Sequence, residues 1–496
     1  MRRLSFNMLS SVIYRVAIIL TGLAVQRYIL SCFGSEINGL TSGIAQILSY
    51  LVLLEAGIGA ATVSSLRGPL AENDTNRVSR LLAESGRMYR RAGLVFLALL
   101  ALLSALLPFL IEGSHSPITV AFLTAFGGMG SLISYLTVGK YTPLLTADGR
   151  LGFLYLTDTL NALISCGARI YLMSAGADIV AVQAVLPTCA ALRAIAVAFY
   201  VKHRYNAVNP RVTPSDELKK IRRSAMTHQV VGLVVAHTDV TLLTLLSSLK
   251  NVSLYSVYSY IYNSISTMLE ALFSQTVIAP LGKKAAEGQE SFNSAFLALQ
   301  AIYNAILYLF LTVALILTLP FISVYTAGID DMEYTRLSLA VLFCLGAFLN
   351  LLRLPSIVTV NVYGYFKETE KSAVLECAIN LGLSLLLFPF LGIHGLLLGT
   401  VAAYLFRTQD TVRFVYKKCG LSYQNLLRAN IGNLLASAAV ILLFFVFFPV
   451  TAGSVAEWVL KAFCITVISA LIFAAINLIF NGAVFKKLIR PQQDNQ

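Results

Sequence analysis

Four arginines lie within long apolar stretches of the sequence: Arg15, Arg193, Arg353 and Arg407. Each is about eight to ten residues from the same end of its stretch, so on helices that rise about 1.5 Å per residue their depths are similar. A guanidinium presents a fork of donors that matches phosphate or carboxylate oxygens. We therefore expect a cationic cavity, open to the cytoplasm, that binds a multiply charged anion. Alternatively, each arginine extends to the lipid headgroups or pairs with an acid such as Glu55 or Glu270.

Five acidic residues also lie within apolar stretches: Glu55, Asp158, Asp239, Glu270 and Glu376. A charge at the centre of a bilayer costs roughly 2.5–3.5 kcal/mol on insertion, so each acid needs a partner or water. Such a carboxylate can exchange a proton or bind Na⁺ and so couple transport to an ion gradient. Structural ion pairs with the arginines are the other interpretation. Asp239 is best placed for coupling, but His237 lies roughly opposite it on a helix, so we expect no dyad.

No pattern in the sequence indicates catalysis. We find no nucleophile beside a base, no metal-ligand constellation and no glycine-rich phosphate loop. The seven cysteines are scattered without a C-x-x-C pair, which predicts neither disulfides nor a metal site. We expect a protein that is not an enzyme and that uses no cofactor, with H⁺ or Na⁺ as the candidate coupling ions.

The composition is that of an integral membrane protein. Of 496 residues, 57% are hydrophobic and only 12% are charged, and the mean hydropathy is +0.76. A membrane-spanning helix needs about 20 mainly apolar residues. We predict fourteen such spans, with no large polar domain between them: 8–30, 38–66, 92–111, 117–139, 152–174, 179–201, 225–249, 253–280, 293–320, 334–362, 372–390, 394–416, 429–448 and 457–480.

The lysines and arginines outside the spans predict the orientation. One side of the predicted membrane holds nearly all of them, whereas the connections on the other side hold only Lys250. Cytoplasmic loops retain such charges, so both termini are expected in the cytoplasm. The net charge of +13 follows from these loops, which contact anionic lipid and lack the clustering of a nucleic-acid site. The N-terminus shows no cleaved signal peptide.

Landmarks recur along the chain at a nearly constant offset. The offset from Glu55 to Glu270 equals that from Gly149 to Gly364. It is one position shorter from Arg193 to Arg407 and three positions longer from Asp158 to Glu376. We predict two six-helix lobes that are related as a repeat, as in many transporters that work by alternating access. The predicted domains are an N-lobe at 1–204, a basic cytoplasmic linker at 205–224, a C-lobe at 225–418, and a C-terminal helix pair with its tail at 419–496.

Three runs carry a resemblance to a known family. They are "INGLTSGIAQILSYLVLLEAGIGAATVSSLRGPLAEND" (37–74), "HTDVTLLTLLSSLKNVSLYSVYSYIYNSI" (237–265) and "LRLPSIVTVNVYGYFKETEKSAVLECAINLGLSLLLFPFLGIHGLLLGTVAAYLFRT" (352–408). The sequence resembles the polysaccharide flippases of the multidrug/oligosaccharidyl-lipid/polysaccharide (MOP) exporter superfamily. Such proteins move undecaprenyl-pyrophosphate-linked oligosaccharides across the bacterial plasma membrane.

The resemblance implies roles for particular residues. The pyrophosphate would be the anion bound by the arginines, with Arg353 in "LRLP" and Arg407 in "YLFRT". The segment "SSLRGPLAEND" departs from the family pattern at Arg67 and Gly68. Fourteen spans resemble the lipid II flippase branch, in which the added helix pair offers a groove for the polyprenyl tail.

Several functions compete. The leading hypothesis is a flippase for a lipid-linked oligosaccharide, with membrane lipids, glycan polymerases and glycosyltransferases of the same pathway as partners. The alternatives are a lipid II-type or teichoic-precursor flippase and an ion-coupled drug exporter, although four arginines argue against cationic drugs. A membrane glycan polymerase or transferase is unlike this chain, because no predicted outer loop exceeds about ten residues. A channel or scaffold is the remaining class.

Overall fold

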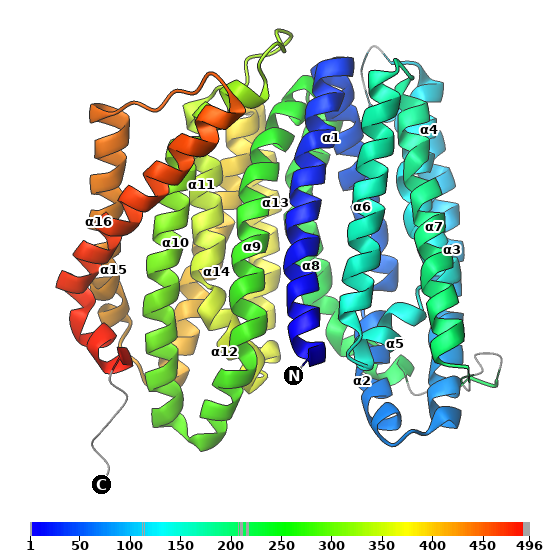
Figure 1. Cartoon of the computed structure of the whole chain (residues 1–496), viewed down its shortest axis with the longest axis horizontal. Helices are drawn as coiled ribbons and strands as arrows, with labels where there is room; N and C mark the ends of the chain where they lie inside the picture. The colour runs from blue at the N-terminus through cyan, green and yellow to red at the C-terminus, as the bar shows by residue number, and fades with distance from the viewer. Residues whose placement is uncertain are drawn as a thin grey trace. The chain divides into compact units, whose positions relative to one another are not determined.

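The computed structural model describes residues 2–489 except 112, 114, 207, 209–211 and 215–217 (Figure 1). Part of the predicted linker 205–224 and the tail after residue 489 therefore lie outside the described residues. Within the described ranges all regular structure is helical, which confirms the all-α prediction. The helices in chain order are α1 (Arg2–Ser49), η1 (Tyr50–Glu55), α2 (Ile58–Ala71), α3 (Thr75–Leu110), α4 (Pro117–Thr137), α5 (Tyr141–Ala147), α6 (Leu151–Ser174), α7 (Ile179–Arg204), α8 (Leu218–Leu246), α9 (Leu249–Glu287), α10 (Gln289–Tyr325), α11 (Leu337–Leu352), α12 (Leu354–Tyr363), α13 (Phe366–Leu391), α14 (Ile393–Lys418), α15 (Tyr423–Leu442), η2 (Leu443–Phe447) and α16 (Val455–Ile489).

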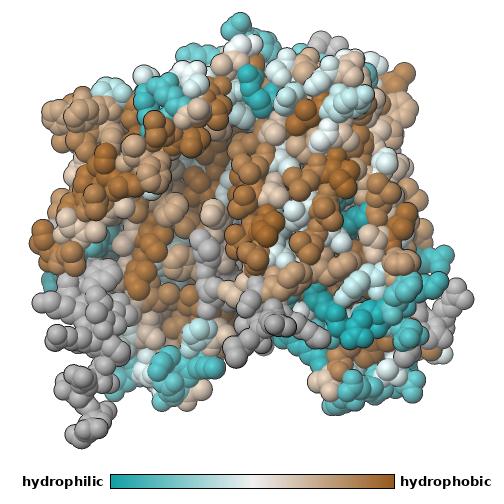
Figure 2. All heavy atoms as spheres, in the orientation of Figure 1, coloured by the Kyte–Doolittle hydropathy of each residue, from teal (hydrophilic) through white to brown (hydrophobic). Residues whose placement is uncertain are grey.

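The helices have the length and apolarity of a multi-pass membrane protein. In the part of the chain that the structure describes, nine helical stretches are long and apolar enough to cross a bilayer. Helices α6, α9 and α14 are not among these stretches, and α8 contributes only a shorter apolar segment, Gly232–Leu246. Asp158, Asp239 and Arg407 lie on α6, α8 and α14. On the face shown in Figure 2, apolar side chains cover the sides of the helices and polar side chains gather at their ends. The count of fourteen spans and the cytoplasmic termini remain predictions.

Two predicted spans differ from the helices that form. Within α1 the backbone has a non-helical break at Gly34 (φ 81°, ψ 179°), between the predicted spans 8–30 and 38–66. The predicted span 38–66 is itself interrupted, because the 3₁₀ segment η1 and the left-handed Gly57 (φ 77°) separate α1 from α2. The predicted span 334–362 breaks at Arg353, because Pro355 disfavours continued helix before it. Apolar length predicts how far a segment can reach but does not reveal breaks within it.

The chain divides into two compact units, Met1–Ser256 and Val257–Gln496. In the first unit α6 packs between α1 and α7, and α4 packs against α3 and α7 (Figure 1). In the second unit α13 and α14 pack along each other, and α15 and α16 pack against α10 and each other. Each unit has its own apolar cores, which include Phe96 in the first and Phe296 in the second.

Helix bounds recur at the offset that the sequence predicts. The first residues of α7 and α14 are separated by the same offset as their last residues, and this offset equals that from Arg193 to Arg407. The first residues of α3 and α10 are separated by this same offset, and their last residues by one position more. Gly149 follows α5 and Gly364 follows α12, both with left-handed backbones (φ 70° and 73°). The helices thus repeat from one half of the chain to the other, as the spacing of the charged residues indicates.

Candidate functional site

Three charged side chains converge in the second unit. Arg353 lies between α11 and α12, Glu376 on α13 and Arg407 on α14. One Nη of Arg353 donates to Oε1 of Glu376 at 2.7 Å, and Nε of Arg407 lies 3.5 Å from Oε2. The side chains are 12%, 8% and 11% exposed, respectively. One carboxylate therefore lies between two guanidiniums, and this buried group carries a formal charge of one positive unit.

Arg353 keeps a donor to spare, whereas an Nη of Arg407 donates to the carbonyl of Thr369 at 3.0 Å. Arg353 also donates to Oδ1 of Asn350 at 2.6 Å and lies over the ring of Tyr404, 5.4 Å from its centroid. Its Nε is buried and has no hydrogen-bond partner among the described residues. The second acid near Arg407 is Asp410 at 3.9 Å, which is 39% exposed and therefore more screened by solvent. A buried donor without a hydrogen bond costs about 1–3 kcal/mol. An oxyanion that reached Arg353 could accept the hydrogen bond that the described residues do not accept.

A similar group forms in the first unit. Nε of Arg193 on α7 donates to Oδ1 of Asp158 on α6. Tyr14 of α1 stacks on Tyr155 of α6 with ring centroids 5.6 Å apart. The charges of Asp158, Arg193 and Arg15 all act on the Tyr14 hydroxyl. The first unit thus places one tyrosine near two arginines and one carboxylate.

The hairpin geometry explains why the same ion pair forms twice. In an antiparallel pair, residues near the start of one helix lie beside residues near the end of the next. Glu376 is ten residues past the start of α13 and Arg407 is eleven residues before the end of α14. Each residue is about 15 Å along its helix, which corresponds to the middle of a bilayer. On α7, Arg193 is likewise eleven residues before the last residue, whereas Asp158 is seven residues past the first residue of α6, about one helical turn earlier than Glu376 on α13.

The paired glutamates of the sequence prediction have different surroundings. Glu55 ends η1 and accepts a hydrogen bond from the hydroxyl of Tyr135 on α4, with Tyr89 of α3 also in its field. A tyrosine rather than an arginine is thus its partner in the described structure. Glu270 is exposed on α9, and its charge acts on Tyr303 of α10.

Asp239 and His237 contact different elements, as their helical spacing predicts. Asp239 of α8 is 4% exposed, and its Oδ2 accepts a hydrogen bond from Tyr255 of α9 at 2.9 Å. Nδ1 of His237 contacts Oε1 of Gln46 on α1, and its ring lies edge-on to Tyr50 with centroids 6.0 Å apart. Among the described residues no three His, Cys, Asp or Glu side chains gather as metal ligands.

Sequence inspection missed a cation that the repeat would have revealed. Lys140 immediately precedes the short helix α5, as Arg353 precedes α12. Its side chain is half-buried, and burial lowers the pKa of its ammonium group. The ammonium lies 5.0 Å from the ring centroid of Tyr141. Aligning the two halves on the short helices would have placed Lys140 beside Arg353 in the list of candidates.

The uncharged partners were also missed. Gln183 of α7 accepts a hydrogen bond from Arg169 of α6 at 3.3 Å, and Asn350 does the same for Arg353. Amides and tyrosines cost less than charges in an apolar stretch, so they do not stand out in sequence. The repeated helix–helix pairing is the signal that could have found them.

Known structures resemble the fold, although no protein-family model and no curated protein sequence matches the chain. The lipid II flippase MurJ in an inward closed conformation is similar with a TM-score of 0.67 and 14% identity over 98% of this chain and 99% of that one. An inward-facing multidrug resistance MATE family transporter of the MOP superfamily has a TM-score of 0.61 and 13% identity over 82% and 98%. A MOP superfamily transporter from Pyrococcus furiosus has a TM-score of 0.57 and 12% identity over 84% and 96%. At these identities the likeness establishes the fold.

Proposed function

Because the chain has the fold of the MOP-superfamily transporters, we propose that it is a flippase for a lipid-linked oligosaccharide. Its substrate is an undecaprenyl-pyrophosphate-linked oligosaccharide or repeat unit, moved across the bacterial plasma membrane for cell-surface polysaccharide synthesis. The headgroup crosses by alternating access through a cationic cavity, as in transporters built from repeats.

The observation that carries the proposal is the pair of guanidiniums on Glu376. Arg353 and Arg407 share one carboxylate inside a helix bundle, and Arg353 retains a buried donor without a partner among the described residues. A pyrophosphate presents several anionic oxygens that accept from two arginines at once. In the absence of substrate, Glu376 reduces the cost of burying two like charges. Arg15 and Arg193 are the anion-binding candidates of the first unit.

Two observations favour a flippase over a drug exporter. The likeness to MurJ extends over 98% of this chain, whereas the MATE transporter covers 82%. Buried arginines also repel the cations that such exporters often carry. A lipid II-type or teichoic-precursor flippase would use the same arginines and differ in the glycan, so it remains the second candidate.

The remaining roles follow from this proposal. Asp239 is the first candidate for H⁺ or Na⁺ coupling, because it is a buried carboxylate bonded to an uncharged tyrosine. Glu55, bonded to Tyr135, is the second. The glycosyltransferases that build the glycan and the polymerase that consumes it are the expected partners.

Depletion of the protein tests the function directly. We expect loss of surface glycan and accumulation of lipid-linked sugar in the inner leaflet; depletion without accumulation would refute the proposal. The double variant Arg353→Glu/Arg407→Glu should fail to restore surface glycan to the depleted strain, although the variant protein is still present in the membrane. Lys367→Glu/Lys417→Glu is the matched control, because it makes the same charge change at exposed positions of α13 and α14. Full activity of the arginine variant would also contradict the proposal.

A further inference from the structure

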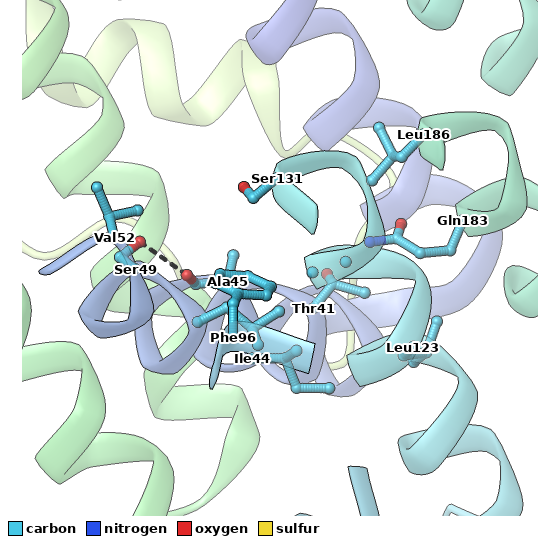
Figure 3. Close-up of a pocket in the computed structure, with 13 residues that line it drawn as sticks. Thr41, Ile44, Ala45, Ser49, Val52, Phe96, Leu123, Ser131, Gln183 and Leu186 are labelled. Carbon is cyan, nitrogen blue, oxygen red and sulfur yellow. Dashed lines mark hydrogen bonds between the residues drawn. The ribbon is translucent and has the colours of Figure 1, made fainter. Parts of the chain in front are cut away.

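A cavity of about 240 Å³ lies in the first unit among α1, η1, α3, α4 and α7 (Figure 3). Its inner wall includes Phe96, which is 1% exposed, and Gln183, which is 8% exposed. Ala45 on its rim is exposed and Ser49 is half-exposed. The cavity therefore opens along the α1 face and ends at buried side chains.

The side chains that line this cavity carry no charge. None of its thirteen lining residues in the described structure is Asp, Glu, Lys, Arg or His. A phosphate, an ammonium or a metal ion that entered the cavity would lose its hydration and find no compensating charge in the lining, which is costly. An occupant of this cavity is therefore a neutral group.

The polar lining offers both acceptors and a donor. The hydroxyl of Thr41 donates to the carbonyl of Ile37 at 3.0 Å, and that of Ser49 donates to the carbonyl of Ala45 at 2.9 Å. Each hydroxyl oxygen thus keeps lone pairs to accept a further bond. Ser131 adds a third hydroxyl. The occupant is consequently one with several hydroxyl groups of its own.

Gln183 supplies the donor, and Arg169 orients it. Arg169 donates to Oε1 of Gln183 at 3.3 Å, which leaves the amide nitrogen to the cavity. In Figure 3 that nitrogen lies on the side of the Gln183 amide turned toward Thr41, and it lies 3.9 Å from where a Cβ at Gly127 would be. Arg169, which is half-buried and not itself part of the lining, thereby orients a neutral donor.

The size of the cavity limits the occupant to one ring. Sites for drug-sized ligands span roughly 300–1,000 Å³, so a cavity of about 240 Å³ holds something smaller. Its apolar wall includes Phe96, Leu123 and Leu186. Hydroxyls, an amide and apolar surface together match a sugar ring, which has polar edges and apolar C–H faces.

We infer that this cavity binds one neutral sugar ring of the transported glycan, an inference that rests on the proposed flippase function. The arginines would bind the pyrophosphate, which all such substrates share. The cavity would read the adjoining sugar, which differs among them. Substrate selectivity then depends on Gln183 and on the space beside Gly127.

Ligand-detected NMR on the purified full-length protein tests this inference. The probes are the methyl glycosides of glucose, galactose, mannose and N-acetylglucosamine. We expect saturation transfer to at least one of them and loss of that signal in Gly127→Leu. A Cβ at Gly127 would lie 3.0 Å from Cδ1 of Leu48, a flexible end that can yield, so the new side chain fills the cavity. Gly167→Leu is the matched control, because a Cβ there meets nothing within 4 Å.

A second variant removes the donor and keeps the partner of Arg169. Gln183→Glu retains an oxygen for Arg169 and loses the amide nitrogen, so we expect glycoside binding to weaken about tenfold. No binding of any glycoside to the native protein would overturn the inference, as would unchanged binding in Gly127→Leu. Stabilisation by inorganic pyrophosphate is measured in parallel. If glycosides bind but pyrophosphate does not stabilise the protein, the arginine proposal fails and the sugar site stands. If pyrophosphate stabilises the protein but no glycoside binds, the sugar site fails and the arginine proposal stands.

Discussion

Asp158 and Glu376 lie on corresponding helices of the two halves of the chain, and each lies beside the arginine of the helix that follows. Asp158 accepts from Arg193, and Glu376 lies 3.5 Å from Arg407. Glu376 also accepts a direct bond from a second guanidinium, that of Arg353 at 2.7 Å. The two units thus repeat one ion pair, and in the second unit two guanidiniums share its carboxylate.

Replacing Glu376 with Gln separates stability from anion binding. The change leaves Arg353 and Arg407 without their shared carboxylate, and breaking such a buried pair costs about 3–5 kcal/mol. We expect a lower Tm in detergent but a larger rise in Tm on addition of pyrophosphate, because the anion then meets no competing carboxylate.

The control is Glu368→Gln, which removes an exposed carboxylate from the same helix. It should change neither Tm nor the response to pyrophosphate. A Glu376→Gln protein that pyrophosphate stabilises no more than the native protein would show that these arginines do not bind the anion.

A double-mutant cycle measures the pair in the first unit. Asp158→Asn leaves Arg193 without its carboxylate, and Arg193→Gln leaves Asp158 without its guanidinium. The double variant should therefore lose less stability than the sum of the two single losses. We expect a coupling of about 0.5–3 kcal/mol from thermal unfolding. Glu72 and Lys202 provide the control cycle, because both side chains are exposed and no ion pair of the described structure joins them. Additive losses for Asp158 and Arg193 would mean that their contact contributes nothing measurable.

The sequence predicts that charged residues recur in the two halves and need compensation, but it does not predict which acid pairs with which arginine. Each charge in an apolar stretch stands out because it needs compensation, and the constant offset between the halves relates Arg193 to Arg407. Arg353 joins Glu376 only because the backbone breaks between α11 and α12. Apolar length and helical periodicity contain no information on where such a break directs a side chain.

The cavity beside Gln183 could not be predicted from sequence at all. Gln183, Ser131 and Gly127 lie on two helices whose apolar stretches look ordinary, and none is charged. A cavity is a property of packing, because it forms where side chains of separate helices fail to meet. Sequence patterns describe each helix by itself and therefore cannot locate it.

Gly39 allows a close backbone contact between α1 and the first residue of α9. A Cβ at this position would lie 1.8 Å from the carbonyl oxygen of Leu249, which belongs to the backbone and cannot yield like a side chain. We expect Gly39→Ala to destabilise the protein by about 1–3 kcal/mol or more, measured by thermal unfolding in detergent. Gly167→Ala should instead be neutral or stabilising, because alanine favours a helix with open space. Equal stability of the two variants would rule out this contact.

Hydrogen bonds attach the C-terminal helices to the rest of the second unit. The hydroxyl of Thr312 on α10 donates to that of Ser437 on α15 at 2.9 Å; Thr312 is buried and Ser437 is half-buried. Thr312→Val and Ser437→Ala each remove the same bond with little change of shape. Such bonds between membrane helices contribute about 0.6 kcal/mol on average and up to about 1.7.

We therefore expect each single variant to lower the free energy of unfolding by about that amount, and the double variant to lower it no further. Steric trapping or thermal unfolding in lipid bicelles measures the three values. Thr466→Val on α16 is the control, because its hydroxyl donates at 2.6 Å to the carbonyl of Ala462 in its own helix. Losses that add in the double variant would mean that Thr312 and Ser437 stabilise the protein independently, and α15 would then be held to α10 by apolar packing.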